Sequence, residues 1–202
     1  SMNTKIIISG HSAGLGLALA EHYLNQGWPV LGLSRRSVDG WPSEKLQQHS
    51  IDLSDGEALS AWLSDGLLAQ FVQDVDEIVL INNAGVVAPN AVVGAQDTAA
   101  VIRAVSLNVG APLSLSNAAI AAKPEAALLK IVHISSGAGR KAYPGWSVYG
   151  ATKAALDHHA LCVAAEAHQG VKIISVAPGV VDTDMQAEIR AAAPAQFPIL
   201  ER

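Results

Sequence analysis

The sequence predicts an α/β fold in which helices cover both faces of a doubly wound parallel sheet of about six strands. Short runs rich in Ile, Val and Leu recur along the chain, and stretches with helical patterns separate them. Strands that alternate with helices build βαβ units, and nearly continuous apolar strands are typical of a sheet covered on both faces. The clearest predicted strands are residues 5–9, 30–33, 77–81, 130–134 and 171–177.

The composition suits one domain, residues 1–202, with a sizeable core, because half of the residues are hydrophobic. Ser1 precedes Met2 and is expected to be an addition to the natural chain. The net charge of −5 and the lack of a Lys/Arg run argue against nucleic acid or an anionic membrane as partners. No apolar run approaches the roughly 20 residues of a membrane span. The first strand begins too early to leave room for a signal peptide.

The single cysteine, Cys162, cannot form an internal disulfide and fits a reducing, cytoplasmic compartment. It has no evident activator and is expected to be a small buried residue. His158 and His159 are adjacent, so they cannot share a helix face and are expected to be interface or surface residues. No metal site is therefore predicted.

The first strand leads into a glycine loop with Gly10, Gly14 and Gly16, then a helix over 17–26 and the strand 30–33. In such a βαβ unit the glycines let backbone N–H groups approach a pyrophosphate at the helix N-terminus. The alternative is a plain tight turn, but the flanking strand and helix favour the binding loop.

Arg35 and Arg36 close the second strand, where a unit that binds NAD usually carries an acidic residue for the ribose 2′-hydroxyl. Two guanidinium groups suit a 2′-phosphate instead, and Ser12 could add a hydroxyl. The first carboxylate after the strand is Asp39. The alternative is that Arg35 and Arg36 are a pair of solvated surface residues without a ligand.

A third strand is expected to end at 50–53, and a helix with an apolar stripe is expected over 58–72. Asp52 could be the N-cap of that helix. The fourth strand runs into Asn-Asn-Ala-Gly at 82–85, whose amides could satisfy orphan backbone groups where strands diverge.

A long helix is expected over 96–122, interrupted near Gly110 and Pro112, with Asn108 just before the interruption. Asn108 could be an ordinary polar helix residue. The strand 130–134 leads to Ser136, and an almost wholly apolar helix, expected to be buried on more than one side, covers 147–168. Tyr149 and Lys153 lie one turn apart on it, and an ammonium beside a phenol favours the phenolate. Such a tyrosine is a usable proton donor.

Five motifs in this order resemble the short-chain dehydrogenase/reductase family over nearly the whole chain. They are the glycine loop (with Ser9 before it where Thr is usual), the Asn-Asn-Ala-Gly run at 82–85, Asn108, Ser136 with Tyr149 and Lys153, and Pro178-Gly179. The resemblance implies a Rossmann-type sheet with strand order 3-2-1-4-5-6. Its catalytic positions correspond here to Asn108, Ser136, Tyr149 and Lys153.

The resemblance implies an NADP(H)-dependent carbonyl reductase or alcohol dehydrogenase in which Ser136 holds the carbonyl and Tyr149 donates the proton. The cofactor-binding positions it implies are Gly10, Ser12, Ala13, Gly14, Leu15, Gly16, Arg35, Arg36, Asp52, Leu53, Asn82, Ala84, Gly85, Tyr149, Lys153, Pro178, Gly179, Val181 and Thr183. Many relatives that use NADP have a basic residue where this chain has Ala13. The alternative function is an NADP(H)-binding sensor on the same fold, without turnover.

Tyr143, Trp146 and Met185 are expected to rim a substrate pocket for a bulky or aromatic carbonyl. The strand 171–177 would be a sheet edge, although it is nearly continuously apolar. Cover by a second subunit or by the tail around Phe197 is expected, and the alternative is that the natural chain continues beyond Arg202. A homodimer or homotetramer is expected through the helices at 99–122 and 147–168.

Overall fold

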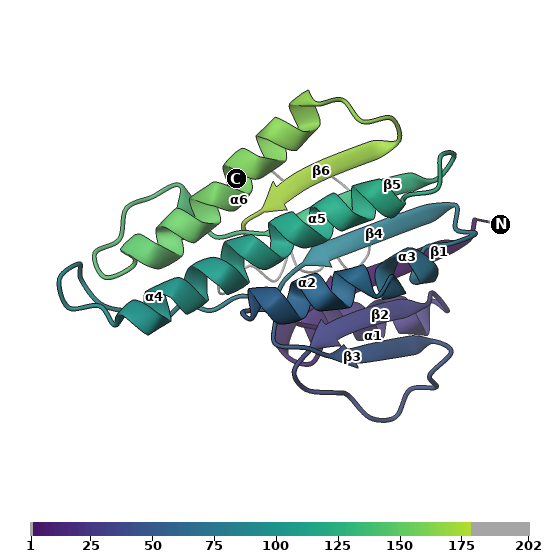
Figure 1. The fold of residues 1–202 in the computed structure, drawn as a ribbon, viewed down its shortest axis with the longest axis horizontal. Helices are drawn as coiled ribbons and strands as arrows, with labels where there is room; N and C mark the ends of the chain where they lie inside the picture. The colour runs from purple at the N-terminus through teal and green to yellow at the C-terminus, as the bar shows by residue number, and fades with distance from the viewer. Residues whose placement is uncertain (1, 179–202) are drawn as a thin grey trace.

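The strands form one parallel sheet in the order β3-β2-β1-β4-β5-β6, which confirms the predicted Rossmann-type topology (Figure 1). The computed structural model describes residues 2–178. Within them the strands are β1 Thr4–Ser9, β2 Val30–Ser34, β3 Leu46–Ser50, β4 Glu77–Asn82, β5 Leu128–Ile134 and β6 Val171–Val176. The helices are α1 Gly14–Asn25, α2 Gly56–Ser64, α3 Leu67–Phe71, α4 Thr98–Val105, α5 Ala111–Ala122 and α6 Ser147–Ala165.

Two apolar clusters fill the two faces of the sheet. One face packs against α2, α3 and α5 through residues such as Ile7, Leu80 and Leu115. The other packs against α1 through residues such as Ile8 and Tyr23. Figure 1 shows α2, α3, α4, α5 and α6 in front of the sheet and α1 behind it. The sheet is thus covered on both faces, as its apolar strands predicted.

The strand register brings the functional loops to one edge of the sheet. Ser9 at the end of β1 lies beside Leu33 on β2 and Asn82 on β4, and Asn82 lies beside His133 on β5. Because the strands are parallel, their carboxyl ends meet at the same edge, where ligands bind in open α/β sheets.

Two predicted elements differ from the structure. The third strand ends at Ser50, so Asp52 and Leu53 lie in the loop that follows it. The single helix expected over 58–72 is two helices, because Gly66 between α2 and α3 adopts the left-handed conformation with φ 79°. Gly adopts positive φ without steric cost, so the chain can turn there.

The helix predicted over 96–122 is interrupted as expected, by a π-helical turn, Ser106–Gly110, that joins α4 to α5. The run Thr98–Ala122 has 25 residues and could cross a membrane by length and composition, which the sequence pattern did not predict. Ala104, Leu115 and Ala119 are nevertheless buried against the domain. A core helix of a soluble protein passes the same test.

The helix α6 is less buried than its apolar sequence predicted. Leu161 is 69% exposed, and Cys162, expected to be buried, is an exposed free thiol. Only one face of α6, with Lys153, Leu156 and Ala160, is turned into the described part of the domain. β6 ends the described sheet, and most of its residues are half-buried. The tail expected to cover it lies outside the described residues.

Candidate active site

A hollow of about 370 Å³ lies at the carboxyl edge of the sheet, between the glycine loop, the loop after β4 and α4. Gly10, Ser12 and Ala13 line it from the glycine loop. A Cβ on Gly16 would stand 2.0 Å from the Gly10 carbonyl oxygen, so this position requires glycine. Gly14, in the left-handed conformation, opens α1 and faces open space, and Leu15 follows it.

The N-terminus of α1 is free to hold an anion. Its N-cap is Ala13, none of the described side chains caps it, and its first turn contains no acidic residue. Backbone N–H groups at such a helix start attract phosphate through their unpaired hydrogens and the helix dipole. The glycine loop therefore fits the pyrophosphate of a dinucleotide.

Ser9 fixes the loop after β4 against the glycine loop. Its Oγ accepts hydrogen bonds from the backbone N–H groups of Asn83 (3.0 Å) and Ala84 (3.1 Å). Asn83 in turn donates from Nδ2 to the Gly10 carbonyl oxygen at 3.1 Å. Ala84 and Gly85 line the hollow as expected, and Asn83 lines it as well.

Asn82, expected at the cofactor, points elsewhere. Its Nδ2 lies 3.3 Å from Ser116 Oγ and 3.2 Å from His133 Nδ1, in the layer between the sheet and α5. Asn82 is absent from the residues that line the hollow, whereas Asn83 is among them. Successive side chains at the end of a strand face different sides, so one asparagine supports the sheet and the other faces the cleft.

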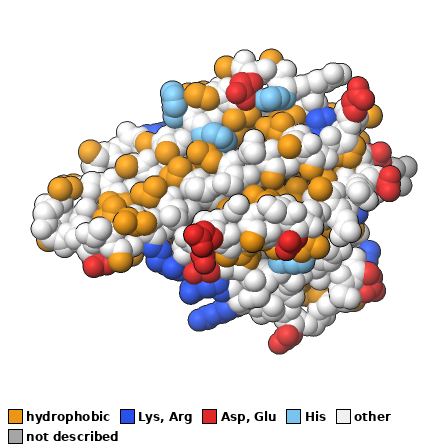
Figure 2. Space-filling view, viewed as in Figure 1, with side chains coloured by type: hydrophobic (Ala, Val, Ile, Leu, Met, Phe, Trp, Pro, Cys, Tyr) orange, Lys and Arg blue, Asp and Glu red, His pale blue; other side chains and the backbone are white. Residues whose placement is uncertain are grey.

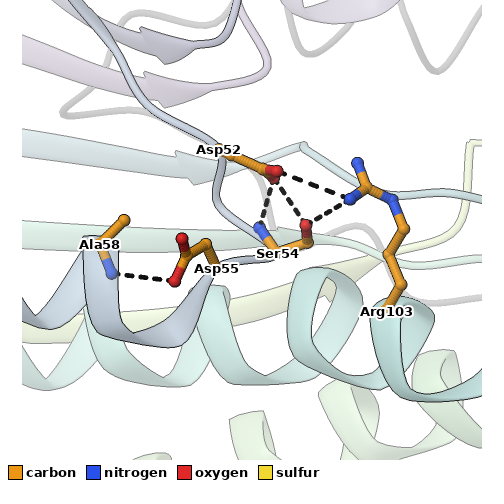
Figure 3. A network of polar contacts seen from close by, with 5 residues as sticks. All are labelled: Asp52, Ser54, Asp55, Ala58 and Arg103. Carbon is orange, nitrogen blue, oxygen red and sulfur yellow. Dashed lines mark hydrogen bonds and ion pairs between the residues drawn. The ribbon is translucent and has the colours of Figure 1, made fainter. Parts of the chain in front are cut away.

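Asp52 and Arg103 bridge the loop after β3 to α4 (Figure 3). Both line the hollow, as does Leu53. Arg103 Nη1 donates to Ser54 Oγ at 2.7 Å and lies 3.5 Å from Asp52 Oδ2. The Ser54 hydroxyl donates to Asp52 Oδ1 at 2.6 Å. The hydrogen bond from Ser54, helped by the charge of Arg103, holds the pKa of Asp52 below its ordinary value.

The helix-cap alternative for Asp52 is wrong, because Asp55 is the N-cap of α2 and accepts from the Ala58 N–H at 3.1 Å (Figure 3). Arg103 was not predicted. It is the only charged residue in the sequence between Thr98 and Ala122, and this isolated charge was the available signal. We call Arg35, Asp52 and Arg103 the charged end of the cleft.

The two arginines after β2 differ in position. Both are exposed, but Arg35 lines the hollow and Arg36 is not among its lining residues. The Arg35 carbonyl oxygen accepts from Ser50 Oγ at 3.0 Å, which ties the loop to the end of β3. The Ser12 hydroxyl, expected to reach a phosphate, lies 2.8 Å from Ser34 Oγ beside Arg35.

Asn108 occupies the π-helical turn and is fully buried. Its Oδ1 accepts from the Val86 N–H at 2.8 Å, and its Nδ2 donates to the Val86 carbonyl oxygen at 2.8 Å and to Thr152 Oγ1 at 3.1 Å. Asn108 thus joins the loop after β4 to α6. A π-turn inside an α-helix often marks a functional site.

Tyr149 and Lys153 lie one turn apart on α6, and Lys153 Nζ stands 5.6 Å from the centre of the Tyr149 ring. Lys153 Nζ also donates to the Ile134 carbonyl oxygen at 3.0 Å. A Cβ on Gly85 would lie 3.2 Å from Asn108 Oδ1 and 3.3 Å from Lys153 Nζ, so glycine lets these groups converge. Asn108, Tyr149 and Lys153 are not among the residues that line the hollow, but Gly85, which Asn108 and Lys153 approach, is. We call Asn108, Tyr149 and Lys153 the buried end of the cleft.

Burial lowers the pKa of Lys153 to about 8, and the charge of Asp157 partly opposes this effect. The ammonium is therefore charged at pH 7 but close to its titration range. Ser136 follows β5 at the start of a short 3₁₀ turn, and its Oγ accepts from the Ala138 N–H at 3.1 Å. The Oγ lone pairs and proton leave further capacity for a substrate.

Three aromatic rings form a ladder that ends at Tyr149. The Tyr143 and Trp146 ring centres are 5.7 Å apart, and those of Trp146 and Tyr149 are 5.4 Å apart, both in edge contacts. Tyr143 and Trp146 also line a second hollow of about 610 Å³ with Arg140 and Lys141. Pro178 is buried just after β6. Gly179, Val181, Thr183 and Met185 lie outside the described residues.

The comparison with known families covers almost the whole chain. A family model described as short chain dehydrogenase matches residues 4–194. A benzil reductase ((S)-benzoin forming) of Bacillus cereus is 37% identical in a match that covers 98% of this chain and 83% of that protein.

Solved structures agree with the sequence comparison. A short-chain dehydrogenase/reductase from Burkholderia vietnamiensis has a TM-score of 0.86 at 48% identity, covering 92% of this chain and 87% of that one. A 4-hydroxyisoleucine dehydrogenase complexed with NADH and succinate has a TM-score of 0.78 at 26% identity, covering 96% of this chain and 93% of that one.

Proposed function

The chain belongs to the short-chain dehydrogenase family, a family of oxidoreductases that use nicotinamide cofactors, and we propose that it is an NADP(H)-dependent carbonyl reductase. The observation that carries the proposal is the convergence of Asn108 and Lys153 on Gly85, with the Tyr149 ring beside Lys153, next to a hollow that also contains an uncapped helix N-terminus. A protein that only sensed the cofactor would not need a tyrosine there.

When bound, the nicotinamide supplies the hydride that reduces the carbonyl carbon. Ser136 holds the carbonyl oxygen through its hydroxyl, and Tyr149 gives that oxygen its proton. The positive charge of Lys153 stabilises the phenolate that remains. Asn108 keeps the π-turn and the Val86 loop in place beside Lys153 through its three hydrogen bonds, and the freed backbone of the turn can hold the water that resupplies the proton.

The preference for a 2′-phosphorylated cofactor is supported by the charged end of the cleft. No acidic side chain directly follows β2, and Arg35 lines the hollow there. A guanidinium group can donate two parallel hydrogen bonds to a phosphate. An acidic residue at this position would instead repel the phosphate. Asp52 and Arg103 would hold the adenine end, and Arg103 could stack on the base.

The proposed substrates are bulky or aromatic ketones and diketones. The aromatic ladder of Tyr143, Trp146 and Tyr149 offers ring faces and edges beside the proton donor. The Bacillus cereus relative is named for benzil, a diketone with two aromatic rings. Benzil is therefore the first substrate to test.

The decisive experiment is Tyr149→Phe, assayed with NADPH and a panel of ketones, diketones and quinones that includes benzil. We expect the rate of NADPH oxidation to fall by roughly 100- to 10,000-fold, because the proton donor is lost. Circular dichroism and calorimetric titration of NADPH are the controls for folding and binding.

Two outcomes would contradict the proposal. A folded Tyr149→Phe variant that binds NADPH and keeps most of its rate would exclude Tyr149 as the acid. Tight NADPH binding by the unmodified protein with no oxidation across the whole panel would favour the sensor.

We also propose that the protein is a homodimer built through α4, α5 and α6 and located in the cytoplasm. Figure 2 shows hydrophobic side chains gathered over these helices. Among them Ile102 is 61% exposed and Leu161 is 69% exposed. Exposed hydrophobic side chains that are gathered in one patch indicate an interaction surface. The free thiol of Cys162 suits a reducing compartment. Light scattering tests the assembly, and a clean monomer at micromolar concentration would contradict it.

A further inference from the structure

Gln48 on β3 clamps the loop that follows β2. Its Oε1 accepts from the Val38 N–H at 2.7 Å, and its Nε2 donates to the Val38 carbonyl oxygen at 2.8 Å. The two bonds fix which way the amide faces, because only the oxygen can accept from the Val38 N–H. The side chain thus holds one residue of the loop at both of its backbone groups, as a neighbouring strand would.

The oxygen of Gln48 has a second partner, His11 of the glycine loop, whose Nε2 lies 2.7 Å away. Since that oxygen only accepts, His11 must donate from Nε2. Burial lowers the pKa of His11, so the ring is neutral near pH 7 and carries this one proton. Its Nδ1 is buried without a hydrogen-bond partner among the described residues, so the bond to Gln48 is the one that orients the ring.

Gly32 on β2 makes room for the His11 ring. A Cβ on Gly32 would stand 2.4 Å from His11 Cγ and 2.5 Å from Nδ1, closer than real atoms approach. Gly32 lies beside Ile8 on β1 and beside Gln48 on β3. His11 therefore crosses over β2 and reaches β3 only because β2 lacks a side chain at this position.

The clamped loop carries Arg35 and Arg36. Its start is held by Ser12, which contacts Ser34, and by Ser50, which donates to the Arg35 carbonyl oxygen. Its end is held at Val38 by Gln48. The side chains of the two arginines are exposed between these anchors, while the backbone of the loop is held at both ends.

The geometry points to Gln48, supported by His11, as a positioning residue that determines the preference for a 2′-phosphorylated dinucleotide. Gln48 is not among the residues that line the hollow. It fixes the backbone from which the arginines would reach the phosphate. The loop therefore loses less conformational entropy when the ligand binds. The inference rests on the proposed use of NADP(H), and its test is a binding measurement that is separate from the Tyr149 assay.

The experiment is calorimetric titration of NADP⁺ and NAD⁺, which differ only by the 2′-phosphate, into Gln48→Ala. We expect the dissociation constant for NADP⁺ to rise about tenfold, the equivalent of one charge-assisted hydrogen bond, and that for NAD⁺ to stay unchanged. The matched control is Gln47→Ala, the same change at the exposed neighbour on β3, which should leave both constants unchanged.

His11→Phe is the second variant, because it keeps a ring over Gly32 and removes the bond to Gln48. It should shift the ratio of the two dissociation constants in the same direction by a smaller factor. If circular dichroism shows that Gln48→Ala is not folded, His11→Phe tests the inference in its place. An unchanged ratio in both folded variants, or an equal loss for both dinucleotides, would overturn the inference. Equal binding of NADP⁺ and NAD⁺ by the unmodified protein would overturn it too, and the proposed cofactor preference with it, but would leave the reductase assay untouched.

Discussion

At the charged end of the cleft, Asp52 and Arg103 keep 38% and 42% of their side-chain surface exposed. At the buried end, Asn108 is fully buried and Lys153 is 5% exposed. The charged end is held by one ion pair and hydroxyl contacts that water can replace. The buried end is held by hydrogen bonds from the amide of Asn108 and the ammonium of Lys153, and both side chains are buried.

This difference in exposure separates the part of the cleft that we expect to set cofactor affinity from the part that we expect to carry the reaction. Exposed charges contribute little to folding, so the charged end can be altered at small cost to stability. Buried polar groups cost free energy unless they are paired, so every change at the buried end affects both stability and reactivity. The following variants test this contrast, beginning with the largest expected effect.

Lys153→Met should reduce the rate of NADPH oxidation on the order of 1,000-fold, because the charge that stabilises the phenolate is lost. The same change should raise the melting temperature at pH 7, measured by scanning fluorimetry without cofactor. Burial lowers the pKa of Lys153 from 10.5 to about 8, so folding at pH 7 places a charged ammonium in an unfavourable site.

The sign of this effect is visible in its pH dependence. Between pH 8 and 10.5 the unfolded chain holds the Lys153 proton and the folded chain does not, so this group makes stability rise with pH in that window. The Lys153→Met variant should lack this rise. A lower melting temperature at pH 7, with the rise retained, would contradict the assignment.

Asn108→Leu should lower the free energy of unfolding by about 2–4 kcal/mol, since it removes the hydrogen bonds of a fully buried amide and leaves both backbone groups of the half-buried Val86 without this partner. Urea unfolding measures the change. Asn117→Leu, at an exposed position of α5, is the control and should change stability by less than about 0.5 kcal/mol. Equal effects of the two substitutions would show that the hydrogen bonds of Asn108 add nothing.

The double variant Arg35→Ala with Arg36→Ala should raise the Michaelis constant for NADPH by roughly 10- to 100-fold and spare NADH. Arg35→Ala alone should account for most of the change, because Arg35 lines the hollow and Arg36 does not. Steady-state kinetics with both cofactors measure it. Equal use of NADPH and NADH by the unmodified protein would refute the preference.

Acid should destabilise the fold through His133, whose pKa falls to about 3, first because it is buried and then because of its electrostatic interactions with His159 and Lys153. Unfolded His133 takes up a proton below about pH 6.5. Folded His133 does so only near pH 3, so stability is lost as the pH falls through this window. Melting temperatures from pH 7 to 4 should fall less steeply in His133→Gln. Parallel curves for the two proteins would show that another group is responsible.

Arg103→Met should have the smallest effect. Its exposed ion pair with Asp52 contributes about 0–1 kcal/mol to stability, so the melting temperature should hardly change. The dissociation constants of NADPH and NADH should both rise a few-fold, because the adenine end is shared by the two cofactors. A change confined to NADPH would place Arg103 at the 2′-phosphate instead.

The sequence by itself determined the order of the elements and the spacing of Tyr149 and Lys153. These depend on local signals: apolar runs, glycine positions and the helical repeat. The strand order was expected from the resemblance of the motifs to a known family. The interruption of the long helix was expected near Gly110 and Pro112, because these residues stand in the helix itself. The break at Gly66 was missed because the apolar stripe continues across it.

The tertiary structure alone decided which way side chains at the strand ends face and which distant residues meet. Neighbours in sequence, Asn82 and Asn83, went to different sides, since strand side chains alternate. Arg103 met Asp52, and His11 met Gln48 over Gly32, across separations that no local pattern encodes. Such contacts depend on how closely two strands or a helix and a loop approach, and that distance is set by the packing of the whole sheet.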